Sequence, residues 1–172
     1  MGVEEHRATA AAGAARPGWA VVTVSDTRTA ETDLSGAALV DRLRRAGFEV
    51  VRRALVRDRV AEIRNAVRGA LRDRRVDVVL LTGGTGVSPR DLSPEAVRPL
   101  LERELPGFGE LFRILSFAEI GSAAMLSRAC AGTADGKAVF LLPGSPKALA
   151  LAMDRLVLPE IGHLLDQARR RA

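Results

Sequence analysis

Residues 78–91, VVLLTGGTGVSPRD, join an apolar run to a glycine-rich turn and an aspartate. The run 78–81 is typical of a strand buried on both faces. Gly83, Gly84 and Gly86 remove side chains where this strand ends, so the chain can turn sharply and a ligand can approach the backbone amides. Asp91 would repel a phosphate bound there unless a cation lay between them. The segment therefore indicates a metal-assisted phosphate site.

A second segment, residues 140–147 (FLLPGSPK), repeats the order of apolar strand, glycine turn and helix start. Ser145 is a suitable N-cap and Pro146 suits the first helical position, so the free amides of that turn offer a seat for an anion. Lys147 adds a cation. Because ligands bind beyond the carboxyl ends of parallel strands, one cleft can hold both glycine loops. The alternative is an ordinary capped connection between a strand and a helix.

Two common nucleotide motifs are excluded by the residues around the first glycine loop. The dinucleotide fingerprint needs G-x-G-x-x-G, whereas the sequence from Gly84 is GTGVSP. A P-loop needs lysine and then serine or threonine after its last glycine, whereas Gly86 precedes valine and serine. Cysteine and histidine form no cluster with metal-ligand spacing. Cys130 is expected to be a small buried residue rather than a nucleophile, and His163 to be on the surface or in packing.

The composition favours a small anionic ligand over nucleic acid. The chain has 172 residues, 47% of them hydrophobic, and a formal net charge of +5, which predicts one soluble globular domain without a transmembrane helix. Its arginines alternate with acidic residues along expected helices, so solvated helix faces account for most of them. Aromatic residues make up 3% of the chain, so platforms for stacking bases are not evident.

Residues 1–18 have the composition of a tail. They are rich in alanine and end at Pro17 and Gly18, which predicts a disordered segment that includes His6. An acidic pair near the start and the lack of an apolar stretch argue against a secretory signal, so a cytoplasmic location is expected. The folded domain is predicted to span residues 19–168.

Strands and helices alternate through this domain. Strands are expected at 19–24, 48–56 and 76–82, and the polar loop 25–34 is long enough to suggest a function. Helix starts are expected at Ser35, Asp58 and Ser93, the last helix running to about residue 103, with a further helix at 106–117. Asp135 and Gly136 between the apolar runs 125–133 and 138–142 predict a hairpin, followed by a helical section 145–168 interrupted near Pro159. The pattern predicts a three-layer α/β/α sandwich with a mostly parallel sheet and an antiparallel hairpin strand.

Three long segments, LLTGGTGVSPRDLSPEA, ERELPGFGELFRILSFAEIGSAAMLSRACAG and LLPGSPKAL, resemble the molybdenum cofactor biosynthesis protein family, which includes molybdopterin adenylyltransferases. The resemblance extends from about residue 19 to residue 165. Within the family, GSAAMLSRACAG and PGSPK are closer to the MoaB-type branch than to the MogA-type branch.

The resemblance implies transfer of AMP from Mg-ATP to the terminal phosphate of molybdopterin, with release of pyrophosphate. The attacking oxygen is already an anion, so catalysis needs positioning and charge neutralisation rather than a serine or cysteine nucleophile. By analogy with the family, Asp91 holds Mg²⁺ and Asp58 is a second functional carboxylate, although Asp58 also suits a plain N-cap. The residues implied in nucleotide or molybdopterin binding are Ser25, Asp26, Gly83, Gly84, Thr85, Gly86, Ser127, Arg128, Pro143, Gly144, Ser145 and Lys147. A structural salt bridge is an equal alternative for Arg128.

The resemblance also implies a homotrimer and a molybdenum insertase that receives the product. Two other functions stay open. One is non-catalytic binding of molybdopterin or a nucleotide, because some MoaB-type proteins resemble the enzymes without clear activity. The other is an interaction module. This function is disfavoured because the domain is not fused here to a larger scaffold protein. The presence of both Asp58 and Asp91 favours the enzyme.

Overall fold

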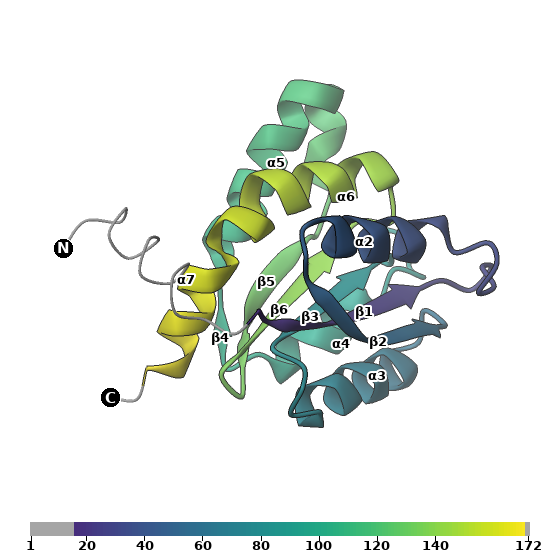
Figure 1. The fold of residues 1–172 in the computed structure, drawn as a ribbon. Coiled ribbons are helices and arrows are strands. Elements are labelled where there is room, and N and C mark those ends of the chain that lie inside the picture. Colours follow the sequence, from purple (N-terminus) through teal and green to yellow (C-terminus); the bar gives the residue numbers. More distant parts are fainter. Residues whose placement is uncertain (1–15, 171–172) are drawn as a thin grey trace.

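The computed structural model describes residues 16–170, so the expectations for residues 1–15, including His6, lie outside the described residues. Its centre is a six-stranded sheet in the order β2-β1-β3-β6-β5-β4 (Figure 1). The strands are β1 (Gly18–Val24), β2 (Glu49–Val56), β3 (Val78–Thr82), β4 (Arg103–Glu104), β5 (Cys130–Ala134) and β6 (Lys137–Leu142). The first four in this order run parallel, whereas β5 pairs antiparallel with β6 and β4 antiparallel with β5. The expected mixed sheet is confirmed.

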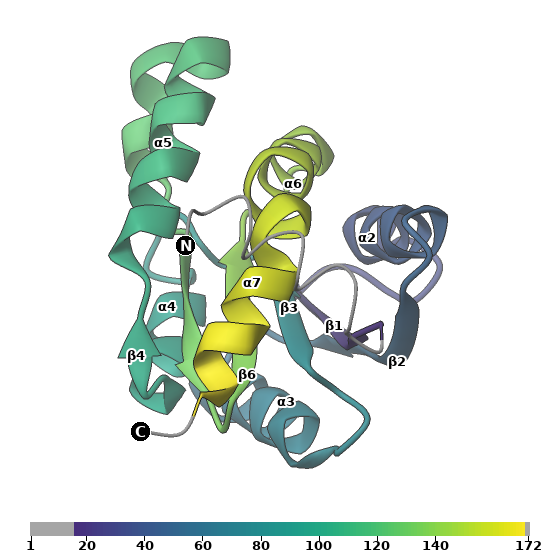
Figure 2. The ribbon, with the colours of Figure 1, turned by 60° about the vertical axis from the view of Figure 1, so that its left-hand side comes forward.

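Helices cover both faces of this sheet, which confirms the three layers (Figures 1 and 2). One face is covered by α2 (Leu34–Arg45), α5 (Pro106–Ile120), α6 (Pro146–Ala152) and α7 (Leu158–Arg169), the other by α3 (Val60–Arg72) and α4 (Ser93–Val97). Side chains of β1 alternate between the two cores: Trp19 and Val21 face the first, Ala20 and Val22 the second. None of the helices in residues 16–170 is long and apolar enough to cross a membrane.

The helix expected to run to about residue 103 is wrong beyond Val97. The chain continues as a short 3-10 turn, η1 (Arg98–Leu100), and then as the edge strand β4, in which Arg103 pairs with Thr133. Pro99 explains the early end, because it has no N–H to continue the hydrogen bonds of the helix.

The hairpin is confirmed at its turn but not at the start of its first strand. Asp135 and Gly136 both have positive φ, 52° and 67°, as a two-residue turn between twisted strands requires. The strand expected from residue 125 begins at Cys130 instead, because Gly121–Leu126 form a 3-10 segment, η2. The interruption of the last helical section is a π-helical turn, η3 (Met153–Val157), directly before α7, where Pro159 has no N–H for a bond to the preceding turn.

Candidate functional site

The two glycine loops lie side by side where the parallel strands β3 and β6 end. The amide of Gly83 donates to the carbonyl of Leu142 at 3.1 Å, and the hydroxyl of Thr82 donates to the carbonyl of Pro143 at 2.9 Å. A Cβ on Gly144 would lie 3.7 Å from the Cα of Gly83. The loops 83–92 and 143–145 therefore form neighbouring walls of one edge of the sheet, where ligands of α/β proteins bind.

Two glycines of the first loop leave room for carboxylates. Gly84 has a φ of +63°, and a Cβ there would lie 2.4 Å from Oδ2 of Asp58. A Cβ on Gly86 would lie 2.7 Å from Oδ2 of Asp91. Both distances are shorter than any tolerated contact, so the loop can wrap around the two aspartates only because these positions have no side chain. The glycines thus bring the loop close to two carboxylates, in addition to the access to backbone amides that the sequence suggested.

Backbone amides fix the two aspartates and a third one. Oδ1 of Asp58 accepts from the amide of Leu92 at 3.0 Å, and Oδ2 of Asp91 accepts from the amide of Ser88 at 2.9 Å. Oδ1 of Asp26 accepts from the amide of Asp58 at 3.1 Å. The alternative of a helix cap for Asp58 is excluded: Arg59 occupies the N-cap position of α3, and no side chain caps it.

Burial is the main cause of a raised pKa at Asp58, and the negative charges of Asp91, Asp26 and Glu95 raise it further. A cation bound among these carboxylates would therefore be stabilised by their negative charges. Within residues 16–170, no group of three or more His, Cys, Asp or Glu side chains is placed to hold a metal ion alone. Mg²⁺ is commonly held by one or two carboxylates together with substrate phosphates, so the oxygen donors of Asp91 and Asp58 fit that ion.

Arg128 fastens the glycine loop to the start of α4. Its Nε donates to the carbonyl of Gly86 at 2.7 Å, its Nη2 to the carbonyl of Asp91, and its Nη1 pairs with Glu95. The amide of Arg128 also donates to the carbonyl of Thr85, whose side chain is buried. The structural salt bridge considered from the sequence is present, and every guanidinium nitrogen of Arg128 has a protein partner. A second tie comes from Ser93, which follows the N-cap Leu92 instead of capping α4 and donates to the carbonyl of Gly83 at 2.9 Å.

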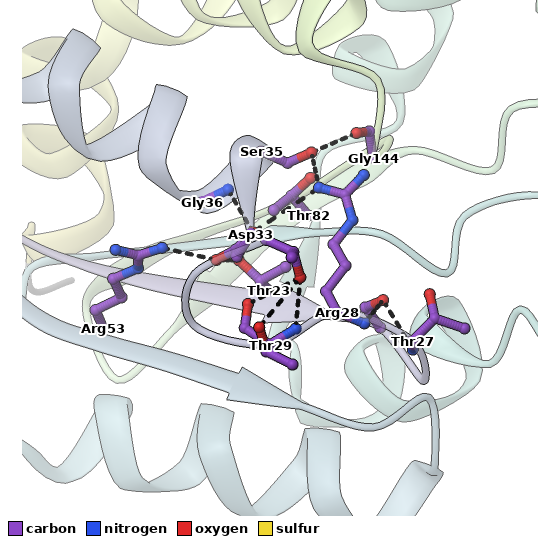
Figure 3. A network of polar contacts seen from close by, with 12 residues as sticks. Thr23, Thr27, Arg28, Thr29, Asp33, Ser35, Gly36, Arg53, Thr82 and Gly144 are labelled. Atoms are coloured by element: carbon purple, nitrogen blue, oxygen red, sulfur yellow. Dashed lines mark hydrogen bonds and ion pairs between the residues drawn. The ribbon is translucent and has the colours of Figure 1, made fainter.

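The long polar loop 25–33 encloses a buried ionic network (Figure 3). Asp33 is only 2% exposed, and it, rather than Ser35, caps α2 by accepting from the amide of Gly36 at 2.8 Å. Its other oxygen accepts from the hydroxyl of Thr23 and from Nη2 of Arg53, both at 2.9 Å. A carboxylate so deep in the fold is stable only because each oxygen has a charged or polar partner.

Ser35 connects this loop to the second glycine loop. Its hydroxyl donates to the carbonyl of Gly144 at 2.6 Å and accepts from Nη1 of Arg28 at 2.9 Å (Figure 3). The backbone of Arg28 is held in turn by the hydroxyl of Ser25, which accepts from its amide at 3.2 Å. Sequence reasoning assigned a function to this loop and singled out Ser25 and Asp26 in it. It did not name Arg28, since nothing distinguishes that residue from the many surface arginines except its place in the loop.

Residues 20–163 match the protein family described as "Probable molybdopterin binding domain". A protein of Halalkalibacterium halodurans, molybdenum cofactor biosynthesis protein B, is 46% identical over 168 residues, covering 97% of either chain. The present chain belongs to this molybdenum cofactor biosynthesis family. The crystal structure of a molybdenum cofactor biosynthesis protein B superposes with a TM-score of 0.89 at 48% identity, covering 92% of this chain and 99% of that one. The tungsten cofactor synthesizing protein MoaB of Pyrococcus furiosus gives 0.83 at 35% identity, covering 92% and 100%.

A hollow next to the second glycine loop is large enough to be considered as a ligand site in a family of molybdopterin-binding domains. A pocket of about 200 Å³ lies between α5, η2 and the start of α6, and four of the residues expected to bind ligand line it: Ser127, Pro143, Ser145 and Lys147. Ser145 holds the N-cap position of α6, but its hydroxyl does not cap the helix, contrary to expectation. A larger hollow of about 410 Å³ between α2 and α6 contains none of the expected site residues, so we assign the site by its chemistry rather than by size.

Cys130 and Phe108 are buried in the two cores. The side chain of Cys130 is 6% exposed, as expected for a small buried residue, and burial raises the pKa of its thiol. Phe108 packs edge-on against Phe140, with ring centroids 5.3 Å apart.

Proposed function

We propose that this chain is a molybdopterin adenylyltransferase, which transfers AMP from Mg-ATP to the terminal phosphate of molybdopterin and releases pyrophosphate. The observation that supports this most directly is the pair of carboxylates, Asp58 and Asp91, enclosed by a loop whose glycines make room for them. A pair of carboxylates beside a second loop with a lysine is suited to a metal-bound polyphosphate and a second anionic substrate.

In this reaction, an anionic oxygen of the molybdopterin phosphate forms a bond to the α-phosphorus of ATP. The bond from that phosphorus to the oxygen bridging to the β-phosphate breaks, and its electron pair leaves with pyrophosphate. Mg²⁺, when bound, supplies charge neutralisation on the polyphosphate. Asp91 would hold it, with Asp58 as the second carboxylate. No proton has to be removed from the attacking oxygen, so the site needs no general base.

The remaining work of the protein is positioning. The amides of the first glycine loop align the polyphosphate. The second substrate lies against the second glycine loop, formed by Pro143, Gly144, Ser145 and Lys147. The pocket that Ser127 and Lys147 line accommodates a ring system of one of the substrates. Alignment of this kind, together with fixed charges, accounts for the larger part of catalysis in phosphoryl transfer.

The test is direct assay of the purified protein with Mg-ATP and molybdopterin, measuring adenylylated molybdopterin and pyrophosphate. We expect both products, and none when Mg²⁺ is chelated. Asp91→Asn should lower the turnover number by about 100-fold or more, as the loss of a group that stabilises transition-state charge does. The variant should keep its fold and its affinity for molybdopterin. Molybdopterin binding without product from the wild-type chain would favour the non-catalytic binding protein instead.

We also propose that the chain forms a homotrimer, passes its product to a molybdenum insertase and works in the cytoplasm. The homotrimer is supported by an exposed apolar surface on α5 and η2. The insertase and the location rest on the family resemblance and on the sequence.

A further inference from the structure

Arg28 reaches from the loop after β1 to the loop after β6. Its Nη1 donates to the hydroxyl of Ser35, and that hydroxyl donates to the carbonyl of Gly144 (Figure 3). The side chain is 33% exposed, so the guanidinium lies partly at the protein surface rather than inside the core. Within residues 16–170, Nη1 is the only nitrogen of this guanidinium that makes a hydrogen bond. Nε and Nη2 therefore remain as donors for a ligand.

The charge of Arg28 is not needed to balance the buried network. Asp33 already has a close ionic partner in Arg53, at 2.9 Å, and accepts from Gly36 and Thr23. Arg28 lies at 4.0 Å from the other oxygen of Asp33, at the limit of an ion pair. Two guanidinium groups thus share one carboxylate, and an excess positive charge faces the second glycine loop.

Charges at this edge of the sheet differ between the two loops, apart from Arg128, whose guanidinium is already bonded to Gly86, Asp91 and Glu95. Asp26, Asp58 and Asp91 lie around the first glycine loop, close enough for the other two to raise the pKa of Asp58. Arg28 and Lys147 belong to the side of the second glycine loop. A phosphate that arrives with a divalent cation suits the acidic side, whereas a phosphate without one needs cationic side chains.

We propose that Arg28 binds the phosphate of molybdopterin on the side of the second glycine loop, and that Ser35 is the positioning residue that orients its guanidinium. The proposal rests on the proposed function, because it assigns the metal-free anion of that reaction to this side. Ser35 fixes two groups with one hydroxyl, since it accepts from Arg28 and donates to Gly144. Asp33 places Ser35 by starting α2 at the correct residue.

The test measures molybdopterin affinity by titration calorimetry without ATP, so that it does not depend on turnover. Arg28→Gln should weaken binding by about 10-fold or more, the loss expected for charge-assisted hydrogen bonds. Arg28→Lys should retain part of the affinity. Arg53→Gln is the matched control, because it removes the other guanidinium on Asp33 and should change stability but not affinity. The KM for ATP, measured with saturating molybdopterin, should be unchanged in Arg28→Gln.

Ser35→Ala, alone and combined with Arg28→Gln, separates positioning from general structure. If Ser35 acts through Arg28, the double variant should bind molybdopterin no more weakly than Arg28→Gln alone. Additive losses would overturn the positioning role. Equal losses from Arg28→Gln and Arg53→Gln, or a raised KM for ATP with intact molybdopterin binding, would overturn the assignment of Arg28. A wild-type chain that binds molybdopterin without turning it over would remove only the proposed activity, and one that does not bind it would remove both.

Discussion

Among single residues, Asp58 combines a role in the site with a cost to the fold. Its folded-state pKa lies above the ordinary value, chiefly through burial, so the ionised carboxylate is less favourable in the folded than in the unfolded chain. Well below pH 4, which is near the ordinary pKa of an aspartate, the group is protonated in both states and this penalty is absent. As pH rises through the raised pKa, the penalty develops. The free energy of unfolding at neutral pH is therefore lower than it would be with a neutral side chain here.

Asp58→Asn should relieve that penalty. At pH 7.5 the variant should be more stable than the wild type, by about 1 kcal/mol or less because the side chain is partly solvated, and the difference should be clearly smaller at pH 4. The amide oxygen can still accept from Leu92, so the loop should keep its shape. Urea unfolding at the two pH values measures the difference, with Asp41→Asn on the exposed face of α2 as control. A variant less stable than the wild type at pH 7.5 would contradict the role of charge repulsion.

The two helix caps show why some residue roles cannot be read from the sequence. Asp33 and Ser35 are both good N-cap residues and lie two positions apart. The choice of Asp33 depends on Thr23 in β1 and Arg53 in β2, which surround its carboxylate only after the sheet has formed. Asp58 was a plausible cap for the same local reason, yet its acceptor atoms face Leu92, more than thirty residues onward. Long-range contacts override local preference at both positions.

At the scale of elements, the sequence predicted those helices and strands whose apolar residues recur at regular spacing, and the turn whose residue types are characteristic. The buried strands, the helices α2, α3 and α5 and the Asp135-Gly136 hairpin follow from apolar spacing and turn chemistry. The early end of α4 was missed despite Pro99, because the spacing of apolar residues continues past it. The short strand β4 has no signal of its own, since two exposed residues become a strand only by pairing with β5. The adjacency of the two glycine loops could be predicted from the parallel strands. The side-chain contacts that hold these loops in place could not.

Arg128 makes several of those contacts, and its removal should impair both the site and the stability of the fold. Arg128→Gln loses the bonds to the carbonyls of Gly86 and Asp91 and the pair with Glu95, so the loop that carries Asp91 becomes mobile. We expect the turnover number to fall by about 10-fold or more, while stability falls by about 1–3 kcal/mol. Arg64→Gln is the control, because Arg64 binds carbonyls of α4 from the α3 side without touching the glycine loop. Steady-state kinetics with urea unfolding compares the two. Equal turnover in both variants would show that Arg128 does not position Asp91.

For the whole molecule, the most informative surface is the outer side of α5 and η2. Leu111, Ile114, Phe117 and Ile120 recur every third residue on α5, and each is more than half exposed. Met125 and Leu126 on η2 continue this apolar surface, with exposures of 76% and 51%. α5 covers the same face of the sheet as α2 but lies at the opposite end of it (Figure 2). Large contiguous apolar patches on an isolated chain mark sites of association.

A second copy of the chain is the partner that the proposed homotrimer requires, and covering these side chains should stabilise the assembly. Ile114→Glu combined with Phe117→Glu places charges on residues that are 65% and 62% exposed, so the fold of each chain should persist while association is lost. Leu34→Glu is the control, because Leu34 is equally exposed, at 68%, but lies on α2. Light scattering coupled to gel filtration should give a trimer for the wild type and the control, and a monomer with an unchanged circular dichroism spectrum for the double variant. A double variant that remains trimeric would place the interface elsewhere, and a monomeric wild type would remove the trimer itself.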